Sequence, residues 1–173
     1  MKILKLMVIG AILSSCDSSD SSNSEVVPKE NYTSFLQWCE DTSLTDEESK
    51  TVEILKTKVG ADGCTDANEK LLDIGILILY STEIRELRPL STLTHLISLN
   101  LSYTEIIDIG PLSSLTKLAE IDLHGTKITN IDPLGSLTDL EKVDITDTDI
   151  SDISSFSKRV NLRDRLSLSG TKI

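Results

Sequence analysis

Aliphatic side chains recur at a constant interval of about 22 residues through the second half of the chain. The spacing is clearest between residues 96 and 156, where Leu99, Ile121 and Val143 occupy one position of the pattern. A second aliphatic position follows two residues later, and a threonine and an isoleucine follow five and seven residues later. Such a period indicates a solenoid in which each repeat is one supersecondary unit that stacks on the next.

Within each repeat, the pattern predicts one short strand and one turn. In the Leu-x-Leu segment two aliphatic side chains point inward while their neighbours point outward, as they do in a strand. Strands of successive repeats would pair in parallel at a spacing of about 4.8 Å. Pro89, Pro111 and Pro133 predict a turn onto the opposite side, followed by one turn of α- or 3₁₀-helix. A fifth repeat begins at Leu166, one position later than the constant interval from Val143 would place it, so the connection at 157–165 is expected to be irregular.

This pattern resembles the bacterial 22-residue leucine-rich repeats of the internalin type, over residues 74–173. The resemblance implies an α/β solenoid: a short right-handed leucine-rich repeat solenoid of about 4.5 repeats, with a parallel sheet on its concave side and a helical cap at its N-terminal end.

Three departures from that family change the expectations. A threonine stands where internalins often place an inward asparagine, so we expect a ladder of weaker side-chain bonds. The threonines of this column are Thr82, Thr104, Thr126, Thr148 and Thr171. The chain also lacks the immunoglobulin-like domain that follows the repeats in internalins. It stops at Ile173 within a repeat, which predicts an uncapped repeat with an unpaired strand edge.

Residues 31–73 lack the repeat pattern and predict two or three short helices. Phe35 to Cys39 carry one apolar face, and a Thr-x-x-Glu capping box begins at Thr45. Gly60 is the predicted end of that second helix, and Thr65 is the start signal of a third. We expect these helices to cover the open end of the first repeat, because a terminal repeat otherwise exposes its apolar core.

Two of the three cysteines, Cys39 and Cys64, lie in this predicted cap. In an exported protein they would form one disulfide, which would stabilise the fold by about 3 kcal/mol in the chain-entropy model. The alternative is a catalytic or metal-binding cysteine, which is disfavoured because neither has another Cys or His at ligand spacing.

The N-terminal segment 1–30 predicts export and lipid attachment. Residues 1–15 have the layout of a signal peptide, with an apolar run that is too short to span a bilayer. The Leu-Ser-Ser-Cys segment ending at Cys16 resembles a bacterial lipobox, which implies cleavage before Cys16 and its modification by diacylglycerol and an acyl chain such as palmitate. The alternative is an ordinary signal peptide that leaves Cys16 as a free thiol. Residues 16–30 predict a lipidated cysteine and a disordered tether with a reach of about 20 Å.

These features predict a lipid-anchored protein of the bacterial cell envelope. Asp17 resembles an inner-membrane retention signal of enteric bacteria. That rule does not extend to all bacteria with two membranes, and we favour the outer membrane or the cell surface.

Composition and charge narrow the classes of function. Aromatic residues make up only 3% of the chain, so the core must be aliphatic, which suits a stacked solenoid better than a globular enzyme. The formal net charge of -11 leaves no basic patch for phosphates, which excludes nucleic acid as a partner. The motifs of serine hydrolases, zinc proteases, phosphate-binding loops and dinucleotide folds are missing, so we predict no enzymatic activity, no catalytic residue and no cofactor.

Alternation along the strands predicts which side chains lie on the concave face. The residues expected to contact a partner are Tyr80, Asn100, Ser102, Glu120, Asp122, His124, Lys142, Asp144 and Thr146. The face changes from apolar at Ile78 and Tyr80 to acidic and polar beyond them. Exposed together, Ile78 and Tyr80 would form its most adhesive patch. The alternative is that the helical cap covers them.

Part of this face carries oxygen and nitrogen ligands. Asn100, Asp122, His124 and Asp144 would lie within reach of one another and could hold a divalent cation. The alternative is a solvated acidic surface, which we favour because a flat sheet supplies few convergent ligands. No metal site is therefore predicted.

Two functions fit these observations. The first is an envelope module that binds a protein or peptide through the concave face, with a larger partner also contacting the loops around Glu83, Glu105, Lys127 and Asp149. The second is a structural or assembly component that forms a homo-oligomer through its uncapped C-terminal repeat.

Overall fold

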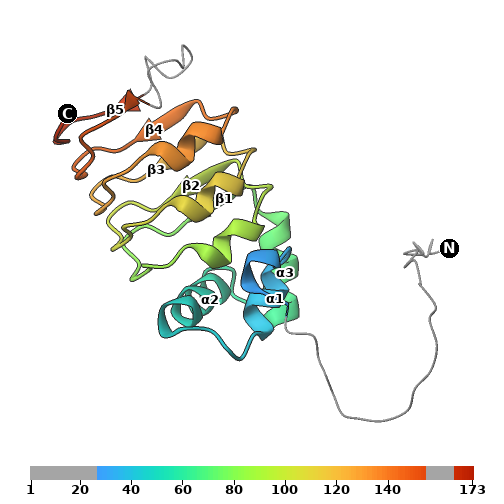
Figure 1. Ribbon diagram of the computed structural model, residues 1–173. Helices are drawn as coiled ribbons and strands as arrows, with labels where there is room; N and C mark the ends of the chain where they lie inside the picture. The colour runs from blue at the N-terminus through green and yellow to red at the C-terminus, as the bar shows by residue number, and fades with distance from the viewer. Residues whose placement is uncertain (1–26, 155–165) are drawn as a thin grey trace, which may run out of the picture.

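The computed structural model describes residues 27–154 and 166–173. Short parallel strands stack from β1 to β5, and three α-helices lie at the β1 end of the stack (Figure 1). The predicted signal peptide, the predicted lipid attachment at Cys16, most of the predicted tether and the connection at 157–165 lie outside the described residues.

The strands form one parallel sheet in chain order. They are β1 (Ile76–Ile78), β2 (Ser98–Asn100), β3 (Glu120–Asp122), β4 (Lys142–Asp144) and β5 (Leu166–Ser167). Each central aliphatic residue pairs with its equivalent in the next repeat, so Leu99 is in register with Leu77 and Ile121. Val143 pairs with Leu166, although the step between them is one position longer than the others. The predicted alignment of the repeats is confirmed.

Each of the first three repeats has one 3₁₀-helix on the side of the solenoid opposite the strands. These helices are η2 (Arg88–Thr92), η3 (Gly110–Ser114) and η4 (Asp132–Ser136). A proline stands at the second residue of each, where its fixed φ is already helical and its missing N–H leaves no bond unmade. The predicted turn onto this side, followed by one helical turn, is confirmed.

The core between the strands and the 3₁₀-helices is aliphatic. In the second repeat Leu99, Leu101 and Ile106 are buried from the strand side, and Leu112 and Leu115 are buried from the helix side. Full burial of one such side chain contributes about 1.5–3 kcal/mol. The first three repeats supply the same buried set, so the core runs unbroken through them, and Val143, Ile145 and Ile150 continue it into the fourth.

The threonine column forms hydrogen bonds within each repeat. Each threonine donates its hydroxyl to the backbone carbonyl three residues earlier, at 2.6–2.8 Å, as Thr104 does to Leu101. These lengths are normal for an O–H···O bond. The short side chain thus satisfies the carbonyl at the end of its own strand, and the expectation of weaker bonds finds no support in the geometry.

The residue before each threonine has a left-handed backbone. The φ angle is +54° at Ser81, +56° at Tyr103, +66° at Gly125, +54° at Asp147 and +73° at Gly170. This conformation costs a non-glycine residue about 1–2 kcal/mol. Because it recurs at Ser81, Tyr103 and Asp147 in spite of this cost, the geometry of the turn requires it. Glycine also makes room here, because a Cβ on Gly125 would lie 3.0 Å from the ring of Tyr103, and one on Gly170 would lie 1.9 Å from a carboxylate oxygen of Asp147.

The N-terminal region is helical, as predicted. Its elements are η1 (Lys29–Asn31), α1 (Phe35–Glu40), α2 (Asp46–Lys58) and α3 (Cys64–Asp73). The capping box of α2 is confirmed, because Glu48 N donates to Thr45 Oγ1 at 3.3 Å while Thr45 N donates to Glu48 Oε2 at 2.7 Å. Gly60 follows the end of α2 with a φ of +60°, as expected for a terminating glycine.

The predicted start signal of the third helix lies two residues after the observed N-cap. Helix α3 begins at Cys64, after Gly63 at the N-cap, and Thr65 lies inside its first turn. No side chain caps this end. Cys64, the first residue of α3, is bonded to Cys39 of α1 with a Cα–Cα distance of 5.5 Å. The predicted disulfide is therefore present.

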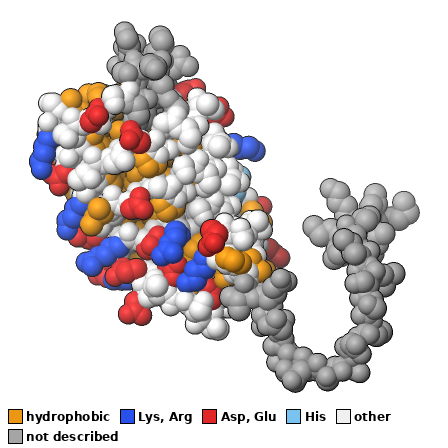
Figure 2. Space-filling view, in the orientation of Figure 1, with side chains coloured by type: hydrophobic (Ala, Val, Ile, Leu, Met, Phe, Trp, Pro, Cys, Tyr) orange, Lys and Arg blue, Asp and Glu red, His pale blue; other side chains and the backbone are white. Residues whose placement is uncertain are grey.

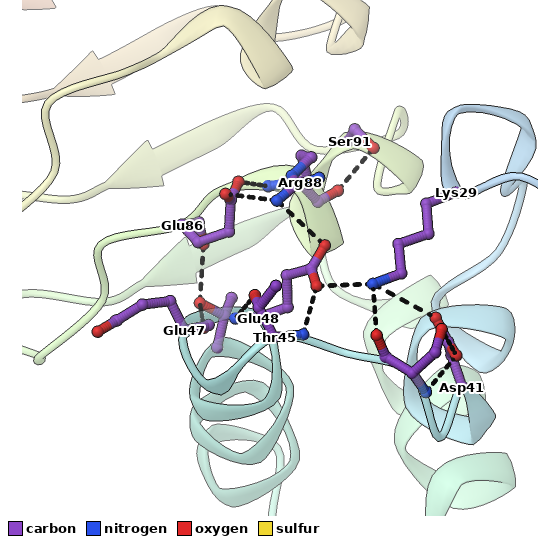
Figure 3. A network of polar contacts seen from close by, with 10 residues as sticks. Lys29, Asp41, Thr45, Glu47, Glu48, Glu86, Arg88 and Ser91 are labelled. Carbon is purple, nitrogen blue, oxygen red and sulfur yellow. Dashed lines mark hydrogen bonds and ion pairs between the residues drawn. The ribbon is translucent and has the colours of Figure 1, made fainter.

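A buried carboxylate fastens the helices to the first repeat (Figure 3). Glu48 is fully buried, and its oxygens lie 2.8 Å from Nζ of Lys29 and 3.2 Å from the guanidinium of Arg88 in η2. Burial alone would raise the pKa of Glu48. The hydrogen bonds from Lys29 and Thr45 and the charge of Arg88 outweigh burial, so the pKa is lowered.

Two further hydrogen bonds cross the same junction. Thr51 of α2 donates its hydroxyl to the backbone carbonyl of Glu86 at 2.7 Å. His95 Nε2 lies 2.8 Å from the carbonyl of Leu71, so this nitrogen carries the proton and donates to the last turn of α3. His95 is half-buried in this position, where it satisfies a carbonyl at the end of α3.

None of the described helices has the length and apolar character needed to cross a bilayer.

Candidate protein-binding face

The outward side of the sheet, called the sheet face below, begins with an apolar patch. Ile76 is 64% exposed, Ile78 57% and Tyr80 54%. The alternative in which the helical cap covers Ile78 and Tyr80 is therefore wrong. The helices contact η2, on the other side of the first repeat, and leave these side chains open to solvent.

Tyr103 extends this patch, although strand alternation does not predict it there. Its side chain is 54% exposed and its ring meets that of Tyr80 edge to face, with centroids 5.6 Å apart. On its other side it contacts the ring of His124, whose Nε2 lies 3.8 Å from a carboxylate oxygen of Asp147. Tyr80, Tyr103 and His124 thus form a row across three repeats, because the left-handed backbone at Tyr103 directs its side chain over Gly125. Below, the apolar patch means Ile76, Ile78, Tyr80 and Tyr103.

Ser102 does not lie exposed on the sheet face, and that prediction is wrong. It is buried, with 3% of its surface exposed. Its backbone N–H and its hydroxyl both donate to Oδ1 of Asn100, at 3.0 and 2.7 Å. Tyr80, the equivalent residue of the first repeat, is exposed, so the burial of Ser102 follows from its short side chain, which folds back onto Asn100.

Beyond the apolar patch the sheet face is acidic. Asn100, Asp122 and Asp144 form one column across β2, β3 and β4, and each accepts a hydrogen bond from the backbone N–H two residues later. Asn100 also donates its amide to Asp122 at 2.9 Å. Glu120 and Lys142 pair in register beside this column. Below, the acidic patch means Glu120, Asp122 and Asp144.

These polar residues line a shallow hollow of about 160 Å³ on the sheet face. Among the described residues, no group of three or more His, Cys, Asp and Glu side chains is arranged to hold a metal ion. The carboxylates of Asp122 and Asp144 instead close the turn after each strand, where each accepts a hydrogen bond from a backbone N–H. Such local bonds between an aspartate and the backbone two residues on are a common device of turns.

A second hollow lies between the helices and the first strand. Its volume is about 500 Å³, and Val59, Ile74, Ile76 and Ile78 line it together with Leu77. Lys58, Lys70 and Asp73 also contribute to its walls. The apolar patch therefore continues into a groove beside the helices, where a partner side chain could be enclosed on two sides.

Charged side chains of both signs gather near the helical end and along one edge of the stack (Figure 2). The loop residues expected to contact a large partner are paired within the protein. Glu83 bonds Lys50 at 2.7 Å, Glu105 bonds Lys127, and Asp149 bonds Lys172 at 2.7 Å. Partner contacts at this edge would have to break these pairs, whereas the sheet face is open.

The comparisons with known proteins agree with this architecture. The family model described as leucine-rich repeats (2 copies) matches residues 94–135 and 116–158. A crystal structure of the internalin InlF from Listeria monocytogenes is 31% identical, with a TM-score of 0.61 over 70% of this chain and 36% of that one. An internalin C2 of the same species is also 31% identical, with a TM-score of 0.50 over 62% of this chain and 43% of that one.

A leucine-rich repeat protein of Leptospira interrogans shows the same fold at 23% identity, with a TM-score of 0.51 over 59% of this chain and 27% of that one. The chain thus spans less than half the length of these structures. The comparison with curated proteins found no match. The chain contains leucine-rich repeats and has the leucine-rich repeat fold with one parallel sheet.

Proposed function

We propose that this chain is a lipid-anchored protein of the bacterial envelope whose sheet face binds a protein or peptide. The observation that carries the proposal is the apolar patch on an open sheet. All four side chains of the apolar patch are more than half exposed, although the protein has an aliphatic core in which such side chains could be buried. Contiguous exposed apolar surface on a soluble domain is typical of an interaction site.

The shape of the face favours a macromolecular partner over a small molecule. Ligand pockets usually enclose most of a small ligand. The hollow on the sheet face and the groove beside the helices are instead both open, and the groove continues along the apolar patch. A standard protein interface uses about 20–30 residues a side, so a sheet with five short strands suits a peptide or a small domain.

Crosslinking in intact cells tests the binding proposal. A photoreactive amino acid is placed at Ile78 on the sheet face, and in a second strain at Ile107, which is 64% exposed but lies outside the strands. We expect a partner protein to be captured from Ile78 and not from Ile107. Equal capture from both positions would refute binding through the sheet face. Capture of a second copy of the chain would favour the alternative, a self-associating envelope component.

The anchor is tested separately. The lipobox ending at Cys16 supports it, together with the Ser-rich segment that follows. Cells are supplied with a labelled fatty acid, and the label is followed in the wild type and in Cys16→Ser. We expect the wild type to carry the label and to fractionate with membranes, and the variant to lose both. A wild type without label would remove the anchor from the proposal and leave the binding face untouched.

A further inference from the structure

The sheet face has two halves of different chemistry, and their order along the solenoid is fixed. The apolar patch lies over β1 and the turn after β2, and the acidic patch lies over β3 and β4. Within residues 27–154 and 166–173, Asp122 and Asp144 form no ion pair with a cation. Lys142 is the one basic side chain at an outward position of β1 to β4.

We propose that the sheet face recognises an extended peptide segment in which an aliphatic or aromatic residue and a lysine or arginine lie three or four positions apart. This inference rests on the proposed function, because it specifies the partner of the same face. It adds the class of side chains that the partner must carry, their spacing, and the direction in which they are arranged.

The spacing follows from the register of the strands. Ile78, Asn100, Asp122 and Asp144 occupy the same position in successive strands. Neighbouring strands lie about 4.8 Å apart, so Asp122 is about 10 Å from Ile78 and Asp144 about 14 Å. An extended chain advances about 3.3 Å per residue. A segment that crosses the strands and places an apolar side chain at Ile78 therefore brings its third or fourth following residue over the carboxylates.

The two ends of the face determine the direction. The walls of the groove beside the apolar patch carry Lys58, Lys70 and Asp73, and Lys70 is paired with Asp66 at 2.8 Å, so a basic residue placed there would meet no net negative charge. At the other end, the carboxylates of Asp122 and Asp144 face outward on neighbouring strands and attract a cation. The apolar residue is therefore expected beside the helices and the basic residue over β3 and β4, since reversal would cost both contacts.

The test uses the full chain, purified as the cell produces it, and defined fluorescent peptides of twelve residues. The first probe carries Leu-Phe, three glycine-serine spacer residues and Arg-Arg. A second replaces Arg-Arg with Glu-Glu, a third replaces Leu-Phe with Ser-Ser, and a fourth lengthens the spacer to eight residues, which places every arginine beyond the expected spacing. We expect the first to bind about 10-fold or more tightly than each of the others, and its affinity to fall with salt because the charge contacts are exposed.

Two variants, each with a matched control, test whether the acidic patch and the apolar patch both contribute to binding. The double variant Asp122→Asn and Asp144→Asn keeps the bond to the backbone N–H, as Asn100 does natively, and removes both charges. Its control is the double variant Asp108→Asn and Asp152→Asn. These two carboxylates also accept a hydrogen bond from the backbone N–H two residues later, but they lie outside the strands of the sheet face. We expect about a 5- to 10-fold loss of affinity for the first probe in the sheet-face variant, and none in the control.

The apolar half has an equally close control. Ile76 and Ile107 are both 64% exposed, and only Ile76 lies on the sheet face. Ile76→Ser is expected to weaken the first and second probes about 5-fold or more, and Ile107→Ser to leave both unchanged. Circular dichroism of all four variants verifies that the fold is retained.

Several outcomes would overturn the inference. Equal binding of the Arg-Arg and Glu-Glu probes would remove the acidic patch from recognition, and equal losses in a variant and its control would remove the sheet face. A dimer that Ile76→Ser dissociates, without binding of any probe, would assign the face to a second copy. If crosslinking at Ile78 captures a partner while the probes show no charge preference, the proposed function stands and only this inference fails. If Ile78 and Ile107 crosslink equally, the proposed function itself fails.

Discussion

Replacing Glu48 with alanine is expected to lower the free energy of unfolding by about 2.5–3 kcal/mol. Loss of the capping box of α2 costs about 1 kcal/mol, and loss of a hydrogen bond to a charged lysine costs about 1.5–3 kcal/mol. Arg88 adds little, because its side chain is 47% exposed. Alanine also removes the cost of burying a charged carboxylate, which offsets part of this loss. The net loss therefore lies in the lower half of the range that the two contributions give together.

The contribution of Glu48 also depends on pH. Its pKa is lower in the folded state than in the unfolded chain, so the folded state is stabilised fully above the unfolded value of about 4.3. This stabilisation is lost as the pH falls from there through the folded pKa. The wild type should therefore lose stability between about pH 4.3 and lower pH more steeply than Glu48→Gln, which keeps the shape of the side chain but cannot titrate.

Trp38 makes the measurement specific to the helical cap. It is the only tryptophan of the chain, it is buried, and it lies in α1. Unfolding in guanidinium is followed by its fluorescence and, in parallel, by far-ultraviolet circular dichroism. The control is Glu53→Ala in the same helix, where the side chain is 63% exposed and the expected change is below about 0.5 kcal/mol. Equal changes in the two variants would refute the assignment of Glu48 as the fastening residue.

Three further predictions concern the rest of the fold, each measured by the same denaturation experiment. Thr104→Val should cost about 1–2 kcal/mol because a buried carbonyl loses its donor, whereas Thr129→Val, at an exposed position, should cost less than about 0.5 kcal/mol. Gly125→Ala should cost about 1–2 kcal/mol from its positive φ and its contact with the ring of Tyr103, whereas Gly63→Ala, with extended backbone and open space around it, should be nearly neutral. Reducing the disulfide between α1 and α3 should cost about 3 kcal/mol, and an unchanged transition of the reduced protein would contradict this.

The repeats could be predicted because every repeat obeys the same local rule. The aliphatic positions that pair across the sheet are the ones that recur in the sequence, so Leu77, Leu99 and Ile121 could be placed in register from their spacing alone. Even the longer step to Leu166 could be predicted, because the position of the strand is fixed by its aliphatic residues and not by the length of the connection before it.

The two errors on the sheet face lie just beyond the second strand. Alternation of side chains holds only in extended backbone, and the strands β1 to β4 are each three residues long. Beyond the strand the turn gives Tyr103 a left-handed backbone and exposes its side chain. Ser102 is buried because its short side chain folds back onto Asn100, whereas Tyr80 in the same column stays exposed. A signal for the left-handed backbone at Tyr103 was present in the sequence, because glycine recurs in the same column at Gly125 and Gly170, and a recurring glycine suggests a left-handed position. The contact of Glu48 with Arg88 had no such signal, since no repeat relates the two residues.

The position of the helices decides where the binding face begins. A helical cap could close the first repeat from either side, and covering Ile76 and Ile78 would bury the most apolar outward pair of the described strands. The observed contacts lie on the other side, where Glu48 meets Arg88 and Thr51 meets the backbone before η2. These polar groups can meet only when the helices lie on the side of η2. In that position the helices close the aliphatic core and leave the apolar patch open. The cap does not bury the side chains on the sheet side. A partner that covers them therefore gains about 1.5–3 kcal/mol for each large aliphatic side chain that becomes fully buried.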